Sequence, residues 1–288
     1  MRINHNTVSL FSYNRLKTVT SKKNQFMGKL SSGKRINKAG DDAAGLGISE
    51  KMRSQIRGMR MAARNAQDAV SLIQTAEGAL SEQHSILQRM RELTVQAASD
   101  INTTEDRGKI ELEVARMIDE LERITIQTEF NTKKIFLGAD ADPYVFQVGA
   151  NEDQTLELNI KRSLVPSFGY FVWEAAGLIA GGPGSDRIID LSDSAKAEQF
   201  LRVTDKAIAD VSNERSNLGS TQNRLESAIS NLRVAEENLI AAESRIRDTD
   251  IASAMVQYTK SQIIEQASLA MLAQANRTPQ GVLRLLGD

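Results

Sequence analysis

The stretch ARNAQDAVSLIQTAEGALSEQHSILQRMRELTVQA, residues 63–97, decides the fold of this chain. Ten positions along it are spaced alternately three and four residues apart, and eight of the ten are apolar. Because this spacing is typical of the buried face of a coiled-coil helix, it predicts one long helix over residues 62–98. The ten residues are Ala66, Ala69, Ile73, Ala76, Leu80, Gln83, Leu87, Met90, Thr94 and Ala97.

Two further helices with apolar faces are predicted beyond this stretch. Asn102, Thr103 and Thr104 offer N-caps for a helix whose face carries Ile110, Val114, Met117, Leu121 and Ile124. A helix over about 195–246 places these residues on one three–four lattice: Leu201, Ile208, Val211, Leu218, Leu225, Ile229, Leu232, Leu239 and Ile246. The same lattice also takes Arg215, Gln222, Glu236 and Glu243. We expect the three helices to form a bundle with a core that includes Ile73, Leu80, Leu87, Leu121, Leu225, Ile229 and Leu232.

The two chain ends have a different pattern. Residues 251–275 are apolar around much of a predicted helix, with Ile251, Met255, Tyr258, Ile263, Ile264, Leu269, Met271 and Leu272. Such a helix exposes a large apolar surface when it is alone, so it needs a partner. Residues 3–35 form a basic amphipathic segment with Val8, Phe11, Val19, Phe26 and Leu30 as apolar points. We expect neither end to be stable alone and both to fold on association.

The middle of the chain differs from both arms. Pro is absent from residues 1–142 and 184–278. This absence favours long helices in both arms, because a Pro inside a helix costs about 3 kcal/mol. Two runs of β-forming residues, 144–148 and 156–160, are linked by Gly149–Asp153 and predict a hairpin. The expected fold class is mainly α: a long antiparallel helical bundle or coiled coil formed by the N- and C-terminal arms, with a small β-hairpin region between them.

Composition and charge narrow the function classes. The 288 residues carry a net charge of −1, which implies no bulk attraction to nucleic acid or to a membrane. Residues 1–42, however, hold nine Lys or Arg against Asp41 and Asp42. There is no Cys, so disulfides and thiolate metal sites are excluded. No run approaches about 18 uninterrupted apolar residues, so we expect no membrane span, and the N-terminus lacks the apolar region of a secretory signal.

No pattern in the chain predicts catalysis. His5 and His84 are the two His residues, and neither belongs to a metal-binding pattern. Gly45-x-Gly47 lacks the rest of a nucleotide fingerprint, so no cofactor or metal is expected and the chain is not expected to be an enzyme. The basic N-terminal arm leaves a rival interpretation open, namely a helical protein that binds nucleic acid or an anionic membrane.

Long ordered blocks of both arms resemble bacterial flagellin. In the N-terminal arm they are LSSGKRIN (30–37), DDAAGLGI (41–48), ARNAQDAVSLIQTAEGAL (63–80) and LQRMRELTVQA (87–97). EFNTKKI (129–135) and FQVGAN (146–151) follow. In the C-terminal arm they are ESRIRDTDIASAM (243–255) and QIIEQASLAMLAQANRTPQGVLRLL (262–286).

The resemblance implies a structural subunit that self-assembles into the helical flagellar filament for swimming motility. It also implies export of the unfolded chain through the flagellar type III channel, so that the protein is secreted and extracellular in the filament. The implied partners are further copies of the chain, an export chaperone, and the filament cap and hook-associated proteins. The nearest rival within this class is a hook–filament junction protein, which shares weaker versions of both ends.

The resemblance further implies a layered organisation. Residues 1–44 and 247–288 would form the inner filament layer (D0), and 45–246 a helical rod with a β-hairpin (D1). A short variable loop region, 161–192, would take the place of an outer domain, so none is expected. Residues 38–48 would form a flexible spoke between the layers. The residues expected to assemble the filament core are Val8, Phe11, Val19, Phe26, Leu30, Ile251, Met255, Ile263, Ile264, Leu269 and Leu272.

Two local features follow from the same resemblance. In the motif LQRMRELTVQ, Arg89 and Leu93, with Glu113 from the next helix, match a patch that the Toll-like innate receptor for flagellin recognises in many family members. EFNTKKI has Thr132 where the family usually has Gly, so we expect the turn at this position to be altered.

Overall fold

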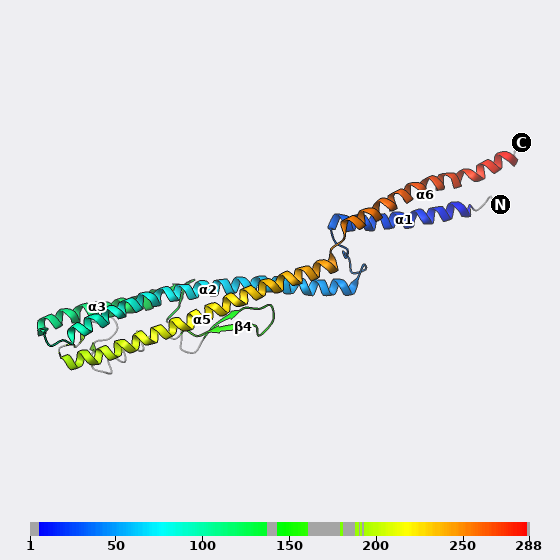
Figure 1. Cartoon of the computed structure of the whole chain (residues 1–288). Helices are drawn as coiled ribbons and strands as arrows, with labels where there is room; N and C mark the ends of the chain where they lie inside the picture. The colour runs from blue at the N-terminus through cyan, green and yellow to red at the C-terminus, as the bar shows by residue number, and fades with distance from the viewer. Residues whose placement is uncertain are drawn as a thin grey trace. The chain divides into compact units, whose positions relative to one another are not determined.

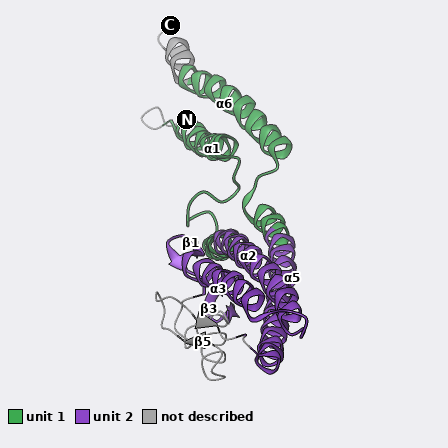
Figure 2. Cartoon of the chain, turned by 90° about the vertical axis from the view of Figure 1, so that its left-hand side faces the viewer, with its two compact units in different colours: residues 1–56, 237–288 green, residues 57–236 purple. Residues whose placement is uncertain are grey.

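The computed structural model describes residues 6–136, 143–160, 179–180, 188–189, 191 and 193–286, and these form two compact units. Unit 1 contains residues 1–56 and 237–288, and unit 2 contains residues 57–236 (Figure 2). Most of the predicted loop 161–192 lies outside the described residues. The division into units does not test the boundaries of the layers, at 44/45 and 246/247, and these stay predictions. The prediction of a mainly helical chain with a small β-hairpin region is confirmed.

Unit 2 is built on three helices that lie side by side (Figure 1). They are α2 (Ala43–Ala97), α3 (Thr104–Gln127) and α5 (Ser194–Arg247), of which the first residues of α2 and the last residues of α5 belong to unit 1. Ion pairs join Arg60 to Glu236 and Arg91 to Asp205. Residue numbers thus fall along α5 as they rise along α2, which makes these two helices antiparallel.

The buried face of α2 matches its sequence pattern. All ten positions from Ala66 to Ala97 in the three–four series are buried. The helix begins at Ala43, however, well before residue 62. Residues 43–48 are therefore helical, and the expectation of a flexible spoke is wrong for them. The reason is local: the Asp42 carboxylate accepts a 2.8 Å hydrogen bond from the Gly45 backbone N–H and starts the helix.

The apolar lattice predicted for α5 is shifted in part. Leu201 and Ile208 are half-buried, whereas the residue before each of them, Phe200 and Ala207, is buried. The observed series is Ala197, Phe200, Thr204, Ala207, Val211, Glu214, Leu218, Thr221 and Leu225. The predicted and the observed series of α5 have every second position in common, such as Val211, Leu218 and Leu225. A count of aliphatic residues along the helix therefore could not distinguish the two series. On α3, Ile118 and Thr125 are buried in place of Met117 and Ile124.

Three polar side chains at core positions form hydrogen bonds. The Gln83 side-chain amide donates to the Thr125 hydroxyl over 3.0 Å, and Thr125 donates in turn to the Leu121 carbonyl over 2.9 Å. The Thr204 hydroxyl likewise donates to the Phe200 carbonyl over 2.9 Å. Because these bonds are made, polar side chains can occupy core positions without the cost of an unpaired buried group.

Short antiparallel strand pairs lie in the middle of the chain. β3 (Tyr144–Gln147) pairs with β4 (Thr155–Leu158), as the hairpin prediction required. β1 (Glu129–Phe130) pairs with β2 (Lys133–Lys134), and β5 (Ile179–Ala180) pairs with β6 (Ile188–Ile189). The hairpin loop packs closely on α2, because a Cβ added at Gly58 would lie 2.9 Å from that of Ala150.

In unit 1, α1 (Thr7–Ser32) and α6 (Ile251–Leu286) pack against each other (Figure 1). The segments that follow α1 and precede α6 are also joined. Arg35 donates its backbone N–H to the Arg247 carbonyl over 2.7 Å, and Thr249 donates to the Gly33 carbonyl over 3.0 Å. Gly33 ends α1 in the left-handed region, with φ 68°. The paired helices are therefore held together at the base of the unit.

Candidate assembly surface

The fully buried side chains on the contact face of α6 are small, while Tyr258 and Leu272 of the same helical repeat are half-buried. Ala254, Ser261 and Ala275 are buried, at positions that follow a helical repeat. On α1, Val19 is the buried aliphatic residue of this contact. Small side chains allow two helices to approach closely. They also remove little apolar surface from water, so this pairing alone is a weak source of stability.

A polar clamp fixes the register of the two helices. Lys23 Nζ donates to Glu265 Oε2 over 2.6 Å, and Thr20 Oγ1 donates to Glu265 Oε1 over 3.0 Å. The hydrogen bond from Lys23, followed by that from Thr20, holds the pKa of Glu265 below its ordinary value of 4.5. At the other end, the Asn6 side-chain amide donates to the Ala275 carbonyl over 2.8 Å.

The large apolar side chains of both helices are left exposed. On α1 the exposed fractions include 64% for Val8 and 73% for Phe11. On α6 they include 65% for Val256 and 61% for Ile263. The remaining exposed members are Leu10, Tyr13, Met27, Ile251, Met255, Leu269 and Met271. Large apolar side chains exposed in such number mark an interaction site on a protein, since they are costly to leave in water.

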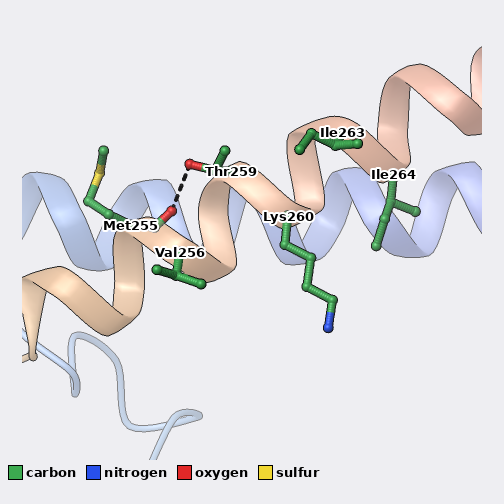
Figure 3. A pocket seen from close by; sticks show the side chains of 6 residues that line it. All are labelled: Met255, Val256, Thr259, Lys260, Ile263 and Ile264. Atoms are coloured by element: carbon green, nitrogen blue, oxygen red, sulfur yellow. Dashed lines mark hydrogen bonds between the residues drawn. The ribbon is translucent and has the colours of Figure 1, made fainter.

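Part of this surface forms an open hollow on α6 (Figure 3). It measures about 540 Å³ and is lined by Met255, Val256, Thr259, Lys260, Ile263 and Ile264. The Thr259 hydroxyl is taken up by the helix itself, because it donates to the Met255 carbonyl over 2.9 Å. Lys260 is the single charged residue of the lining. The hollow can therefore accept apolar side chains.

The predicted filament-core residues divide into three groups. Val8, Phe11, Ile251, Met255, Ile263 and Leu269 are exposed. Phe26, Leu30, Ile264 and Leu272 are half-buried. Val19 is buried between the paired helices. The structure thus leaves the first group available for contacts that unit 1 does not make by itself.

The residues matched to the innate-receptor patch lie on neighbouring helices of unit 2. Arg89 Nη2 donates to Glu113 Oε1 over 3.3 Å, and Arg89 Nη1 donates to Glu92 Oε2 over 3.2 Å. These bonds, with Glu92 the larger influence, raise the pKa of Arg89. Leu93 is different, because it is only 4% exposed and belongs to the core. Arg89 and Glu113 therefore share a surface, while Leu93 lies beneath it.

The residues predicted for the bundle core are all buried or half-buried. Ile73, Leu80, Leu87, Leu121 and Leu225 are buried in unit 2. Ile229 is partly buried against the same core, and Leu232 is half-buried.

Sequence reasoning missed the clamp between α1 and α6. Glu265 is the single acidic residue of the segment 251–286, and α1 contains cations but no acid. That imbalance could have indicated an ion pair, although it would not have identified Lys23 among the five cations of α1.

Two further structural findings bear on function. Within the described ranges, no helix has the length and apolarity needed to cross a membrane. The same part of the chain holds no cluster of three or more His, Cys, Asp or Glu that could bind a metal ion.

Comparison with known proteins identifies the family. The model of the bacterial flagellin N-terminal helical region matches residues 3–141, and that of the bacterial flagellin C-terminal helical region matches residues 201–286. Flagellin of Bacillus subtilis (strain 168) is 49% identical, over 99% of this chain and 100% of the relative. The flagellar filament 33 kDa core protein of Treponema phagedenis is 43% identical, over 99% of this chain and 100% of the relative.

A solved structure shows the same fold at low identity. A putative flagellar hook-associated protein from Vibrio parahaemolyticus is similar with a TM-score of 0.60, over 72% of this chain and 100% of that chain, at 14% identity. The family models and the full-length relatives together establish that the chain belongs to the bacterial flagellin family.

Proposed function

We propose that this chain is a structural, non-enzymatic subunit that self-assembles into the flagellar filament. The observation that carries the proposal is the exposed apolar surface of α1 and α6, together with membership of the flagellin family. A relative at 43% identity is itself a flagellar filament core protein. Further copies of the same chain are the partners that would cover this surface.

The energetics favour assembly through the terminal helices. Each large aliphatic or aromatic side chain that leaves water contributes about 1.5–3 kcal/mol. Several such side chains on each subunit can offset the entropy lost when the helices become ordered. In our proposal, residues 1–44 and 247–288 form the inner layer, D0, and become ordered on polymerisation. Residues 45–246 form the surrounding layer, D1, without an outer domain.

The route to the filament is part of the proposal. The unfolded chain passes through the flagellar type III channel, assisted by an export chaperone, and adds to the extracellular filament under its cap. The absence of Cys is compatible with this route, because no disulfide would restrict the passing chain. Hook-associated proteins would contact the same terminal helices at the ends of the filament.

Recognition by the Toll-like innate receptor for flagellin is proposed for the surface of Arg89 and Glu113. Leu93 would support this surface from within the core, since it is buried. Arg89→Ala should weaken binding of the purified monomer to the receptor ectodomain and leave thermal melting nearly unchanged. Equal binding by the variant and the parent would refute this role.

Seeded growth tests the main proposal. Monomer added to short filament seeds should elongate them, whereas chains that lack 1–35 or 260–288 should stay soluble. Ile263→Asp should also block elongation, because it places a charge on the exposed apolar face. Gln262→Asp is the matched control, since Gln262 is an exposed polar neighbour. Growth by both truncated chains would rule out assembly through the terminal helices.

A further inference from the structure

Unit 1 carries two separate exposed apolar sites. The first, the N-terminal patch, consists of Val8, Leu10, Phe11 and Tyr13, each more than half exposed. The second, the α6 groove, is the hollow lined by Met255, Val256, Thr259, Lys260, Ile263 and Ile264 (Figure 3).

The two sites lie at opposite ends of the helix pair. Asn6 binds Ala275 and Lys23 binds Glu265, so the two helices run antiparallel. Interpolation between these contacts places Phe11 at the level of about residue 272 of α6. With a rise of 1.5 Å per residue, Phe11 and Val256 are separated by roughly 24 Å along the pair. The N-terminal patch therefore cannot fill the groove of its own chain.

Charge selects the N-terminal patch as the part of α1 that suits the groove. Lys260 is the only charge in the groove lining, so an incoming segment with Lys or Arg would be repelled. Residues 6–14 carry no charge, whereas the rest of α1 contains Arg15, Lys17, Lys22, Lys23 and Lys29. The first two turns of α1 are thus both its most exposed apolar part and its only extended uncharged part.

We propose that the N-terminal patch of one copy docks into the α6 groove of a second copy. This inference rests on the proposed filament function and specifies which surfaces meet. Because two different surfaces make the contact and they lie apart on each chain, a docked pair still presents one free groove, on the first copy, and one free patch, on the second. A head-to-tail contact of this type extends without limit when its rotation does not close, which produces a helical polymer.

Engineered disulfides test the contact directly, since the chain has no Cys of its own. The double variant Phe11→Cys/Val256→Cys is grown from wild-type seeds under reducing conditions and then oxidised. A disulfide needs Cα atoms within about 7 Å, so the two Cys of one chain cannot join. Docking should therefore convert the monomer band on a non-reducing gel into a ladder of covalent oligomers.

Matched variants separate docking from random collision. Lys17→Cys/Val256→Cys moves one Cys to an exposed position further along α1 and should give no ladder. Each single Cys variant should give no ladder either. If the first double variant does not polymerise, Leu10→Cys/Ile263→Cys tests the same contact.

The outcomes distinguish this inference from the function on which it rests. Polymer without a Phe11–Val256 ladder, or with equal ladders from the Lys17 control, overturns the docking inference and leaves the filament function in place. Failure of the unmodified chain to elongate seeds overturns the filament function itself. A ladder confined to the two patch–groove pairs supports both.

Discussion

Replacement of Thr132 by Gly should stabilise unit 2. Asn131 and Thr132 form the two-residue turn between β1 and β2, and their φ angles are 49° and 65°. Two central residues with positive φ are typical of a type I′ turn, in which Asn-Gly is the preferred pair. Asn131 suits its position, whereas Thr132 places a β-branched side chain in the left-handed region.

The size of the effect follows from two opposing contributions. A side chain in the left-handed region costs about 1–2 kcal/mol, and Gly removes that cost. Gly also loses roughly 0.5–1 kcal/mol more conformational entropy on folding. The 2.6 Å hydrogen bond from the Thr132 hydroxyl to the Asn131 carbonyl is exposed, so its loss changes little. We therefore expect a net gain of about 0.5–1 kcal/mol in the free energy of unfolding.

Urea unfolding followed by circular dichroism measures this gain, and thermal melting should rise by about 2 °C. Thr132→Ala keeps the Cβ and should therefore gain less than the Gly variant. Thr155→Gly is the matched control, because Thr155 is an exposed Thr within strand β4 and its replacement should destabilise the protein. A Thr132→Gly variant that is neutral or less stable than the parent would refute the argument from turn strain.

Three other substitutions test separate parts of the structure. Thr103→Ala removes the hydroxyl that accepts a 3.3 Å hydrogen bond from the Asp106 N–H, and should lower the free energy of unfolding by about 1 kcal/mol in urea titrations. Leu225→Asp should cost more than about 4 kcal/mol, because Leu225 is fully buried, whereas Val234→Asp at an exposed position should leave thermal melting nearly unchanged. Because the pKa of Glu265 is lowered on folding, its contribution to α1–α6 pairing is complete above pH 4.5 and is lost as the pH falls through the lowered pKa. Glu265→Gln filaments should therefore be less stable than the parent at neutral pH and should respond less to acid, as measured by sedimentation; an unchanged acid response would contradict this role.

The sequence by itself predicted the helices and most of their approximate ends, except for the start of α2, which lies at Ala43 and not near residue 62. A three–four repeat places its residues on one face of a helix, and neighbouring helices bury that face. All ten positions of the α2 series are accordingly buried. Capping chemistry is equally local: Thr103 and Asp106 form the predicted start of α3 with each other. The motifs of both arms also predicted the family, which the family models confirmed.

Local patterns could not decide which of two overlapping lattices α5 uses. Both contain Val211, Leu218 and Leu225, and the choice between Phe200 and Leu201 depends on the surfaces of α2 and α3 that face them. The turn at Thr132 is a similar case. Thr disfavours the left-handed region, but the pairing of β1 with β2 holds it there.

The apolar surface of the terminal helices shows most clearly what the sequence determines and what the tertiary structure determines. The sequence alone determined that residues 251–275 have apolar side chains on several faces and need a partner. Only the tertiary structure decided which face α1 covers, through the clamp of Lys23 and Thr20 on Glu265. The physical reason is that several contacts with α1 together set the rotation of α6: Glu265 binds Lys23 and Thr20, and the Ala275 carbonyl accepts from Asn6. With that rotation set, the small residues Ala254 and Ser261 face inward, and large residues such as Val256 and Ile263 stay exposed for another copy of the chain.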